Sequence, residues 1–276
     1  MKMLCLSLVA AALLCPLARA RQAAEIPPAT AEGAAVSSLT PEQRGHALLD
    51  EMVAALGGEA WRSRATMQIE GRGAAFFHGA PDPGVLPYRE FRRFPGSGKP
   101  EAERIEFSKK HDIIQVWTAT AGTEITYKGI QPLPKDQVEE SLRRRVHSIE
   151  EVVRTWLATP GVMVVAEGTA MVGRRMADKV TVLSPNNDAV TIELDAATHL
   201  PLRRTFQWRN AQFKDHDEDS EDYEDYHVIQ GLPTPLTITR YKNGDMVSQR
   251  YLTKVVYNAA LPDTLFDPTI PLHGKK

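Results

Sequence analysis

The sequence predicts a mainly β (α+β) fold built from antiparallel strands. Three observations favour this class. Segments with alternating apolar and polar residues recur along most of the 276-residue chain, short turns rich in glycine, proline and asparagine join them, and only two segments have helical periodicity. Because parallel strands need a long crossover between them, strands joined this closely indicate an antiparallel meander.

The N-terminus has the pattern of a cleaved signal peptide, residues 1–20. Lys2 supplies the positive charge, residues 3–17 are apolar, and Ala18-Arg19-Ala20 offers small residues at the cleavage position. The apolar run is shorter than the ~20 residues that span a membrane. We therefore predict export to the periplasm and a soluble mature protein that begins at Arg21.

The cysteine count restricts the chemistry of the mature chain. Both cysteines, Cys5 and Cys15, lie inside the predicted signal peptide, so disulfides, thiol catalysis and cysteine metal sites are all excluded after cleavage. Lipidation at Cys15 is a weaker alternative, because Leu14 stands where a lipoprotein signal has a small residue. A net charge of −2 also argues against a nucleic-acid partner.

Two segments interrupt the strands. Residues 21–39 lack large apolar residues and are predicted to be a flexible tether, after which Thr40-Pro41 starts a helix that Gly57-Gly58 ends. Residues 136–157 form the second helical region, either one helix or two, because Asp136-x-x-Glu139 and Ser148-x-x-Glu151 both resemble capping boxes. The predicted apolar stripes are Leu48, Leu49, Met52, Val53 and Leu56 in the first region, and Val138, Leu142, Val146, Ile149, Val153 and Trp156 in the second.

The remaining chain is read as strands within one domain, residues 40–270, followed by a short tail, residues 271–276. Alternation of apolar and polar residues predicts each strand, and turn residues separate them. The predicted strands are 67–72, 88–94, 103–107, 113–119, 123–127, 162–167, 179–184, 190–195, 202–209, 224–229, 235–241 and 247–257.

No sequence motif for catalysis or for a cofactor stands out. The eight histidines have no metal-ligand spacing, and residues 168–174 imitate a phosphate loop but lack its lysine and following helix, so we expect a hairpin turn. The acidic run 215–222 fails the calcium-loop pattern and is predicted to be a solvated loop. Residues 143–145, all arginine, are predicted to be a solvated helix face. We expect no enzyme, metal or cofactor, and a hydrolase with an unrecognised carboxylate pair is the weakest alternative.

An apolar strand face is the candidate binding surface. Arg204 has the same parity as Phe206 and Trp208, so it could contact a ligand head group or a lid. The alternative is that these side chains only fill a core. The apolar residues predicted to share one face are Met67, Ile69, Ile105, Phe107, Val116, Val182, Ile192, Phe206, Trp208, Val228, Ile238 and Tyr251.

Four short patterns occur in a fixed order between about residues 40 and 268. They are Leu56-Gly57-Gly58 leading into Met67-Gln68-Ile69-Glu70-Gly71, residues 190–195 before Thr198-His199-Leu200-Pro201-Leu202, Tyr223-Glu224-Asp225-Tyr226 before Gly231-Leu232-Pro233-Thr234-Pro235, and Val255-Val256-Tyr257-Asn258 before Leu265-Phe266-Asp267-Pro268. Together these patterns resemble the LolA/LolB-like family of periplasmic outer-membrane lipoprotein-sorting proteins.

The resemblance implies an unclosed, strongly curved antiparallel β half-barrel, with helices covering its concave side and a hydrophobic cavity between them. It implies binding of lipoprotein acyl chains or lipid, and exchange with a membrane-bound donor or acceptor protein. The sequence departs from the known carriers in its longer tether, its acidic run and the lack of a match to their cavity arginine. A sensor of envelope lipids or lipoproteins with the same half-barrel is the alternative function.

Overall fold

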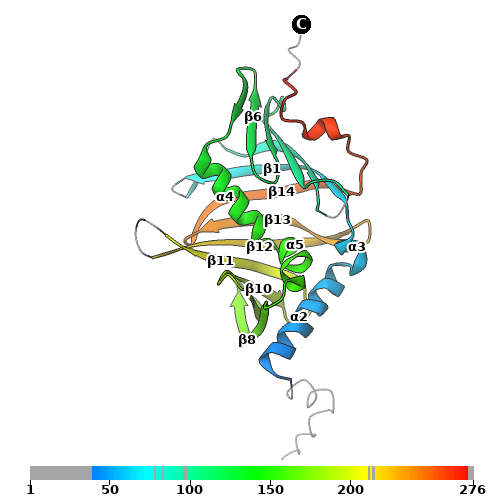
Figure 1. Ribbon diagram of the computed structural model, residues 1–276, viewed down its shortest axis with the longest axis vertical. Helices are drawn as coiled ribbons and strands as arrows, with labels where there is room; N and C mark the ends of the chain where they lie inside the picture. The colour runs from blue at the N-terminus through cyan, green and yellow to red at the C-terminus, as the bar shows by residue number, and fades with distance from the viewer. Residues whose placement is uncertain are drawn as a thin grey trace, which may run out of the picture. The chain divides into compact units, whose positions relative to one another are not determined.

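The computed structural model describes residues 39–77, 79–82, 84–95, 98–210, 212 and 215–272. In this part of the chain the strands form one curved antiparallel sheet of 14 strands, with the longer helices on its concave side (Figure 1). The predicted signal peptide, nearly all of the predicted tether and residues 273–276 of the tail lie outside the described residues. Among the described helices, none is long and apolar enough to cross a membrane.

The sheet departs from a simple meander at one place. β1 (Thr66–Phe77) pairs with β14 (Asp245–Tyr257), so the first and last strands of the main sheet lie side by side in its middle. β7 (Gly129–Pro132) and β8 (Met163–Val172) therefore become its two edges, although they are consecutive strands of the chain. The connection between them crosses the concave face, where Figure 1 shows helices.

The other strands follow their neighbours in sequence through short turns. β2 pairs only with β1, and the rest build the two halves of the sheet on either side of the β1–β14 pair. They are β2 (Ala80–Pro81), β3 (Leu86–Arg93), β4 (Ala102–Phe107), β5 (Ile113–Trp117), β6 (Gly122–Thr126), β9 (Arg175–Leu183), β10 (Ala189–Asp195), β11 (Pro201–Arg209), β12 (His216–Ile229) and β13 (Leu232–Lys242).

The first helix, α2 (Pro41–Leu56), matches its prediction. Thr40 and Gln43 form the capping box, and Gly57 ends the helix with a left-handed φ of 117°. All five residues of its predicted apolar stripe are buried. Gly45 allows a close approach to the sheet, since a Cβ there would lie 3.0 Å from the Ala166 amide nitrogen of β8. A short helix, α3 (Glu59–Arg62), follows.

The second helical region forms two helices, α4 (Lys135–Val146) and α5 (Ile149–Arg154), with a 3₁₀ turn, η1 (Trp156–Ala158). Ser148 caps α5 by accepting from the Glu151 amide, as its capping box predicts. The box predicted at Asp136 is wrong, because the N-cap of α4 is Pro134 and makes no side-chain cap bond.

The apolar stripe predicted for α4 is also wrong. Across this fully described helix Ser141 alone is buried, and Val146 is 46% exposed. The reason is that α4 turns a polar side towards the sheet, where charged residues of β12 and β13 meet it.

The acidic run is a strand rather than the predicted loop. Residues 216–222 belong to β12, and Asp219 is only 1% exposed. The carboxylates tolerate this position because arginines on neighbouring strands neutralise them on both faces. On the outer face Arg203 Nη2 donates to Asp222 Oδ2 at 2.8 Å, while Arg204 pairs with Asp219 on the inner face.

Apolar residues gather in two places. The main core lies on the concave side, between α2 and α5 and the strands from β8 to β14 and β1. A smaller cluster of Ile114, Val116 and Ile125 lies on the other face of the sheet, and Leu272 packs against it. The C-terminal segment after β14, which includes η2 (Asp263–Phe266), thus covers part of the outer face.

Gly71 permits close packing in the middle of the sheet. A Cβ at Gly71 would lie 2.5 Å from the Tyr251 carbonyl oxygen and 2.8 Å from the Tyr88 ring. The ring of Tyr88, which is 4% exposed, takes the space that a side chain at this position would need. Gly73, two residues further along β1, would bring a Cβ no closer than 3.5 Å to its neighbours.

We expect Gly71→Ala to destabilise the protein by about 2 kcal/mol, because overpacking forces the Tyr88 ring or the β14 backbone to shift. Gly73→Ala is the matched control and should change the free energy of unfolding by less than about 0.5 kcal/mol, since the added methyl makes ordinary contacts. Urea denaturation of both variants measures the difference. Equal stabilities for the two variants would contradict this account of β1.

Candidate functional site

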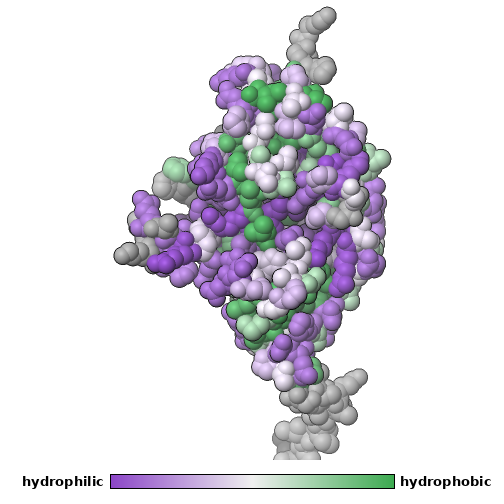
Figure 2. Space-filling model, in the orientation of Figure 1, coloured by the Kyte–Doolittle hydropathy of each residue, from purple (hydrophilic) through white to green (hydrophobic). Residues whose placement is uncertain are grey.

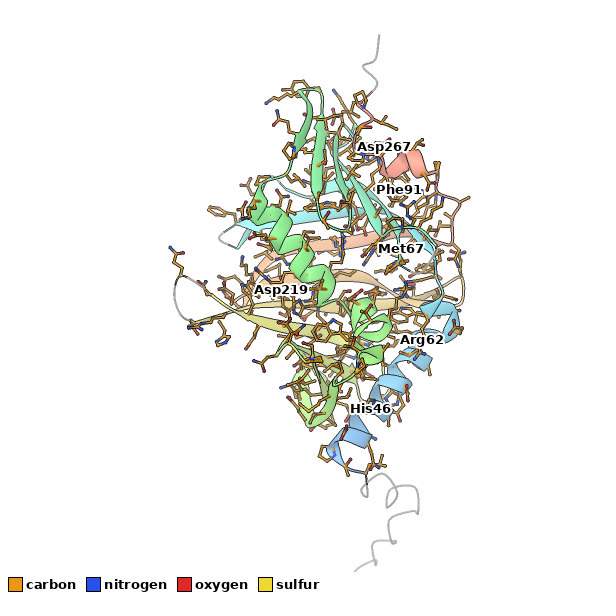
Figure 3. All side chains as sticks on the ribbon, in the orientation of Figure 1. His46, Arg62, Met67, Phe91, Asp219 and Asp267 are labelled. Atoms are coloured by element: carbon orange, nitrogen blue, oxygen red, sulfur yellow. The ribbon has the colours of Figure 1, made fainter. Side chains whose placement is uncertain are left out.

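Ten of the thirteen predicted site residues lie on the concave face or pack against its core. Strand pairing explains this grouping: Ile69 pairs with Glu90, which pairs with Ile105, and Phe206 pairs with Val190, which pairs with Val182. Met67 of β1 and Asp219 of β12 belong to the same face (Figure 3). The ten are Met67, Ile69, Ile105, Phe107, Val182, Ile192, Arg204, Phe206, Trp208 and Ile238.

The other three residues lie on the outer face, so their predicted placement is wrong. Val116 pairs with Arg104, whose side chain lies on the opposite face of β4 from that of Ile105. Val116 therefore belongs to the cluster with Ile114 and Ile125 on the outer face. Val228 pairs with Pro233 and is 72% exposed. Tyr251, 40% exposed, pairs with Arg72 and so faces away from Ile69. In each case the register between neighbouring strands places the side chain on the face opposite to the one expected, because a shift of one residue exchanges the two faces.

An aromatic row marks the junction between α4 and α5. The His147 ring stacks on Phe206 with centroids 4.3 Å apart, and its edge meets Trp156 at 5.6 Å. Phe206 in turn lies 5.5 Å from Trp208. This row runs from the helix junction along β11, beneath the connection that covers the concave face.

His147 is held as a neutral ring. Nδ1 donates to the Arg143 carbonyl oxygen at 2.7 Å, which leaves Nε2 as the unprotonated nitrogen. Nε2 is buried without a hydrogen-bond partner among the described residues, and Asp188 Oδ1 lies 3.9 Å away. Burial lowers the pKa of His147 below its ordinary value, and the positive charges of Arg204 and Arg143 lower it further. The hydrogen bond to the Arg143 carbonyl and the charge of Asp188 act in the opposite direction, but burial is the largest effect.

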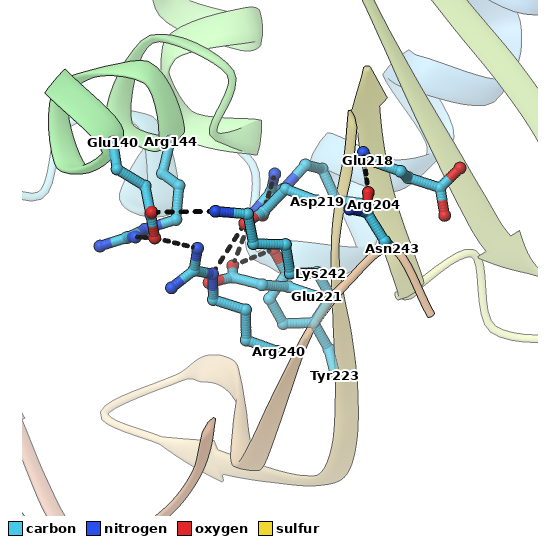
Figure 4. A network of polar contacts seen from close by, with 10 residues as sticks. All are labelled: Glu140, Arg144, Arg204, Glu218, Asp219, Glu221, Tyr223, Arg240, Lys242 and Asn243. Carbon is cyan, nitrogen blue, oxygen red and sulfur yellow. Dashed lines mark hydrogen bonds and ion pairs between the residues drawn. The ribbon is translucent and has the colours of Figure 1, made fainter. Parts of the chain in front are cut away.

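A network of charges joins α4 to the sheet (Figure 4). Arg204 donates to Asp219 at 3.3 Å and to Glu221 at 3.1 Å, while Arg240 Nε binds the second oxygen of Asp219 at 2.7 Å. Arg240 also reaches up to Glu140 of α4, at 2.6 Å. Arg204 is 1% exposed and is held by the carboxylates of Asp219 and Glu221, while its Nε atom is buried without a hydrogen-bond partner among the described residues. Its contact with a head group or a lid stays a prediction.

Glu140 is the carboxylate of α4 on which the network converges. Arg144 and Lys242 contact it at 3.0 and 3.2 Å, in addition to Arg240. Burial raises the pKa of Glu140, but the hydrogen bond from Arg240 and the three positive charges outweigh burial and lower it to about 2. Glu140 is therefore ionised at any pH near neutrality.

The three arginines of residues 143–145 are not a solvated helix face, which corrects that prediction. Arg144 binds Glu140, and the Arg145 side chain, 11% exposed, donates to the Thr118 carbonyl oxygen at 2.7 Å. Arg143 places its guanidinium 4.6 Å from the centre of the Trp208 ring. All three face the protein because α4 meets the sheet with its polar side.

A second buried carboxylate lies on β3. Glu90 is 3% exposed and accepts from Arg250 Nη1 at 3.0 Å, and burial raises the pKa of Glu90 to about 7. Tyr88, on the same strand face, has a buried hydroxyl with no hydrogen-bond partner within the described ranges. The concave face is thus apolar beneath α2 and α5, and strongly charged beneath α4 and beside it.

The aromatic row lines neither of two surface pockets. One is bordered by the strand ends around Asn210, Asp215 and Asn243, and the other, of about 290 Å³, by Ile114, Leu265 and Leu272 on the outer face. The described residues contain no group of three or more histidine or acidic side chains that could hold a metal ion.

Sequence reasoning missed the charge network and His147. The alternation of Asp217, Asp219 and Glu221 within the acidic run carries a strand signal, and its period matches that of Arg204, Phe206 and Trp208. Because nearly every residue of the run is charged, the run shows no alternation of apolar and polar residues and predicts a loop. His147 has no distinguishing local pattern, because its partners come from three separate segments.

Comparisons with known proteins identify the fold. A crystal structure of a DUF1329 family protein from Desulfovibrio piger superposes with a TM-score of 0.57 at 12% identity, covering 83% of this chain and 98% of that one. A putative outer membrane lipoprotein-sorting protein domain from Vibrio parahaemolyticus gives a TM-score of 0.52 at 9% identity, covering 82% and 97%. No family model and no curated protein matches the sequence. The resemblance to lipoprotein-sorting proteins is thus confirmed for the fold.

We expect the neutral, buried His147 to make the protein less stable in acid. Because folding lowers the pKa of His147, the unfolded chain binds a proton that the folded chain does not, so this contribution is complete above about pH 6.5 and is lost as the pH falls below it. His147→Phe keeps the ring stack and removes the titration. As the pH falls from 8 to 5, the free energy of unfolding of the native protein should therefore decrease more than that of the variant. A constant difference across this range would contradict the neutral assignment.

Proposed function

We propose that this protein binds acyl chains of lipids or lipoproteins on the concave face of its half-barrel, in the periplasm, and so contributes to the sorting of outer-membrane lipoproteins. The observation that supports this is a concave sheet face that is apolar beneath α2 and α5 and is bordered by a helix, α4, attached mainly through charged contacts. The fold is also that of a domain described as a putative outer membrane lipoprotein-sorting protein. The proposed role is non-enzymatic, and its partners are a membrane-bound donor or acceptor.

The attachment of α4 favours its role as a movable cover. α2 buries six residues, whereas α4 buries Ser141 alone. The contacts of α4 with β13 run through Glu140, which is 33% exposed as a side chain, and partly exposed ion pairs contribute no more than about 1 kcal/mol each. Lifting α4 therefore costs far less free energy than lifting α2 would.

The apolar part of the concave face suits an acyl chain. Figure 2 shows an apolar band near the centre of this face, bordered by hydrophilic residues. Half-buried side chains such as Ile105, Phe107 and Leu142 contribute to the inner face or to its cover. A chain of twelve methylene groups gains on the order of 10 kcal/mol when it leaves water, since each contributes about 0.8 kcal/mol. That gain is enough to offset displacement of α4.

The direct test is ligand content. Mature protein purified without detergent should retain lipids or acylated peptides that mass spectrometry identifies, and the delipidated protein should bind a fluorescent acyl probe with saturation. Displacement of the probe by unlabelled dodecanoate distinguishes a site from surface adsorption. Absence of both co-purified lipid and saturable probe binding would contradict the proposed function and favour a merely filled half-barrel.

Weakening the attachment of α4 should ease ligand binding. Glu140→Gln removes the charge that Arg144, Arg240 and Lys242 share, so we expect the acyl probe to associate several-fold faster in stopped-flow fluorescence. Glu139→Gln is the matched control, because Glu139 is 56% exposed and contacts only Lys135 of its own helix among the described residues. Equal association rates for the two variants would show that α4 does not gate the site.

A further inference from the structure

We propose that the cargo carries an anionic head group, and that Arg143 and Lys242 hold this head group against Trp208. The inference rests on the proposed function, since it names the chemical class of the ligand of that same face. Arg143 comes from α4, Lys242 from β13 and Trp208 from β11, so three elements meet at this point. We call these three residues the rim cluster.

The geometry of the rim cluster leaves cationic groups directed at one aromatic ring. The Arg143 guanidinium lies 4.6 Å from the Trp208 ring centre, and Lys242 Nζ lies 5.9 Å from it. Arg143 forms no ion pair with any described carboxylate. A guanidinium that stacks on a ring keeps its in-plane N–H groups free, and their fork matches the two oxygens of a carboxylate or phosphate.

The surrounding charges leave one cation in excess. The carboxylates that face this region are Glu140, Asp219, Glu221 and Asp217, and the cations are Arg143, Arg144, Arg204, Arg240 and Lys242. Asp217, opposite Trp208, accepts from the amides of Asn210 and Asn243 instead of a cation. Glu140 is shared by three cations and Arg143 has no ion-pair partner among the described residues, so Arg143 and Lys242 are the least compensated cations of this region.

The aromatic row connects the rim cluster to the core. Trp208 lies 5.5 Å from Phe206, which stacks on His147, and His147 meets Trp156 at the start of η1. A chain anchored at Arg143 would follow this row beneath the junction of α4 and α5. Head group and chain would thus contact adjacent residues of β11, with the charge outside and the methylene groups inside.

A cationic head group is the competing occupant. The surface pocket at the neighbouring strand ends is bordered by Asp215, Asp217 and Glu218, which would attract a positive charge. The two possibilities differ in the sign of the head group, so ligands with one chain and different head groups separate them. Dodecanoate and dodecyl phosphate are the anionic probes, dodecanol is neutral and dodecylamine is cationic.

The experiment measures the dissociation constants of these four ligands for the mature protein by competition with a neutral acyl probe. We expect both anions to bind roughly tenfold more tightly than dodecanol, the range of one charge-assisted hydrogen-bonded contact. Arg143→Gln should reduce this preference to about twofold and leave dodecanol affinity unchanged. Lys135→Gln removes a cation from the other end of α4, where it is 90% exposed, and should keep the preference.

Each other outcome is decisive. Equal affinity for dodecanoate and dodecanol, or tightest binding of dodecylamine, overturns the head-group site but leaves an acyl carrier. A loss of dodecanol binding in Arg143→Gln equal to the loss of dodecanoate binding overturns the assignment of Arg143. Failure of all four ligands to bind the native protein contradicts the proposed function itself. Preference between dodecanoate and dodecyl phosphate separates a fatty-acid head group from a phospholipid one.

Discussion

The pairing of β1 with β14 is the constraint on which the rest of the structure depends. Because the two ends of the folded chain meet in the middle of the sheet, the strands in the middle of the chain, β7 and β8, are left at opposite edges. The connection between those edges has to cross the sheet, and it does so as α4 and α5. The cover over the concave face is therefore part of the topology, and its sequence is free to vary in how firmly it is attached.

The two covering helices use that freedom differently. α5 packs with Ile149, Val152 and Val153 into the main core, while α4 contacts β13 through Glu140, which binds Arg240 and Lys242. Apolar contacts with a close-packed core fix a helix in place, whereas partly exposed ion pairs exchange readily with water. The junction at His147 thus separates a helix with apolar core contacts from one held mainly by ion pairs, and the aromatic row lies where the two meet.

Local patterns in the sequence predicted the elements well and their relative phase poorly. Thr40, Pro41 and Gly57 mark α2 because caps are local chemistry, and Arg204, Phe206 and Trp208 share a face because parity within a strand is local too. The face of Val116 or Tyr251 depends on the register with another strand, which alternation alone does not encode. The acidic run of β12 misled for the same reason, since the cations Arg204 and Arg240 that neutralise it lie on neighbouring strands.

The central strand pair also determines when the protein can become native. The amide of Ala65 donates to the side chain of Asn258, 193 residues further along the chain. The sheet therefore cannot be completed until nearly all of the polypeptide is available to fold. Contacts of such high sequence separation form slowly. If the predicted signal peptide directs export, the chain would cross a membrane in an extended form, and a late-closing sheet would keep the polypeptide competent for that passage. The same delay leaves the unpaired edges of β1 and β14 open to pairing with other chains until the sheet closes.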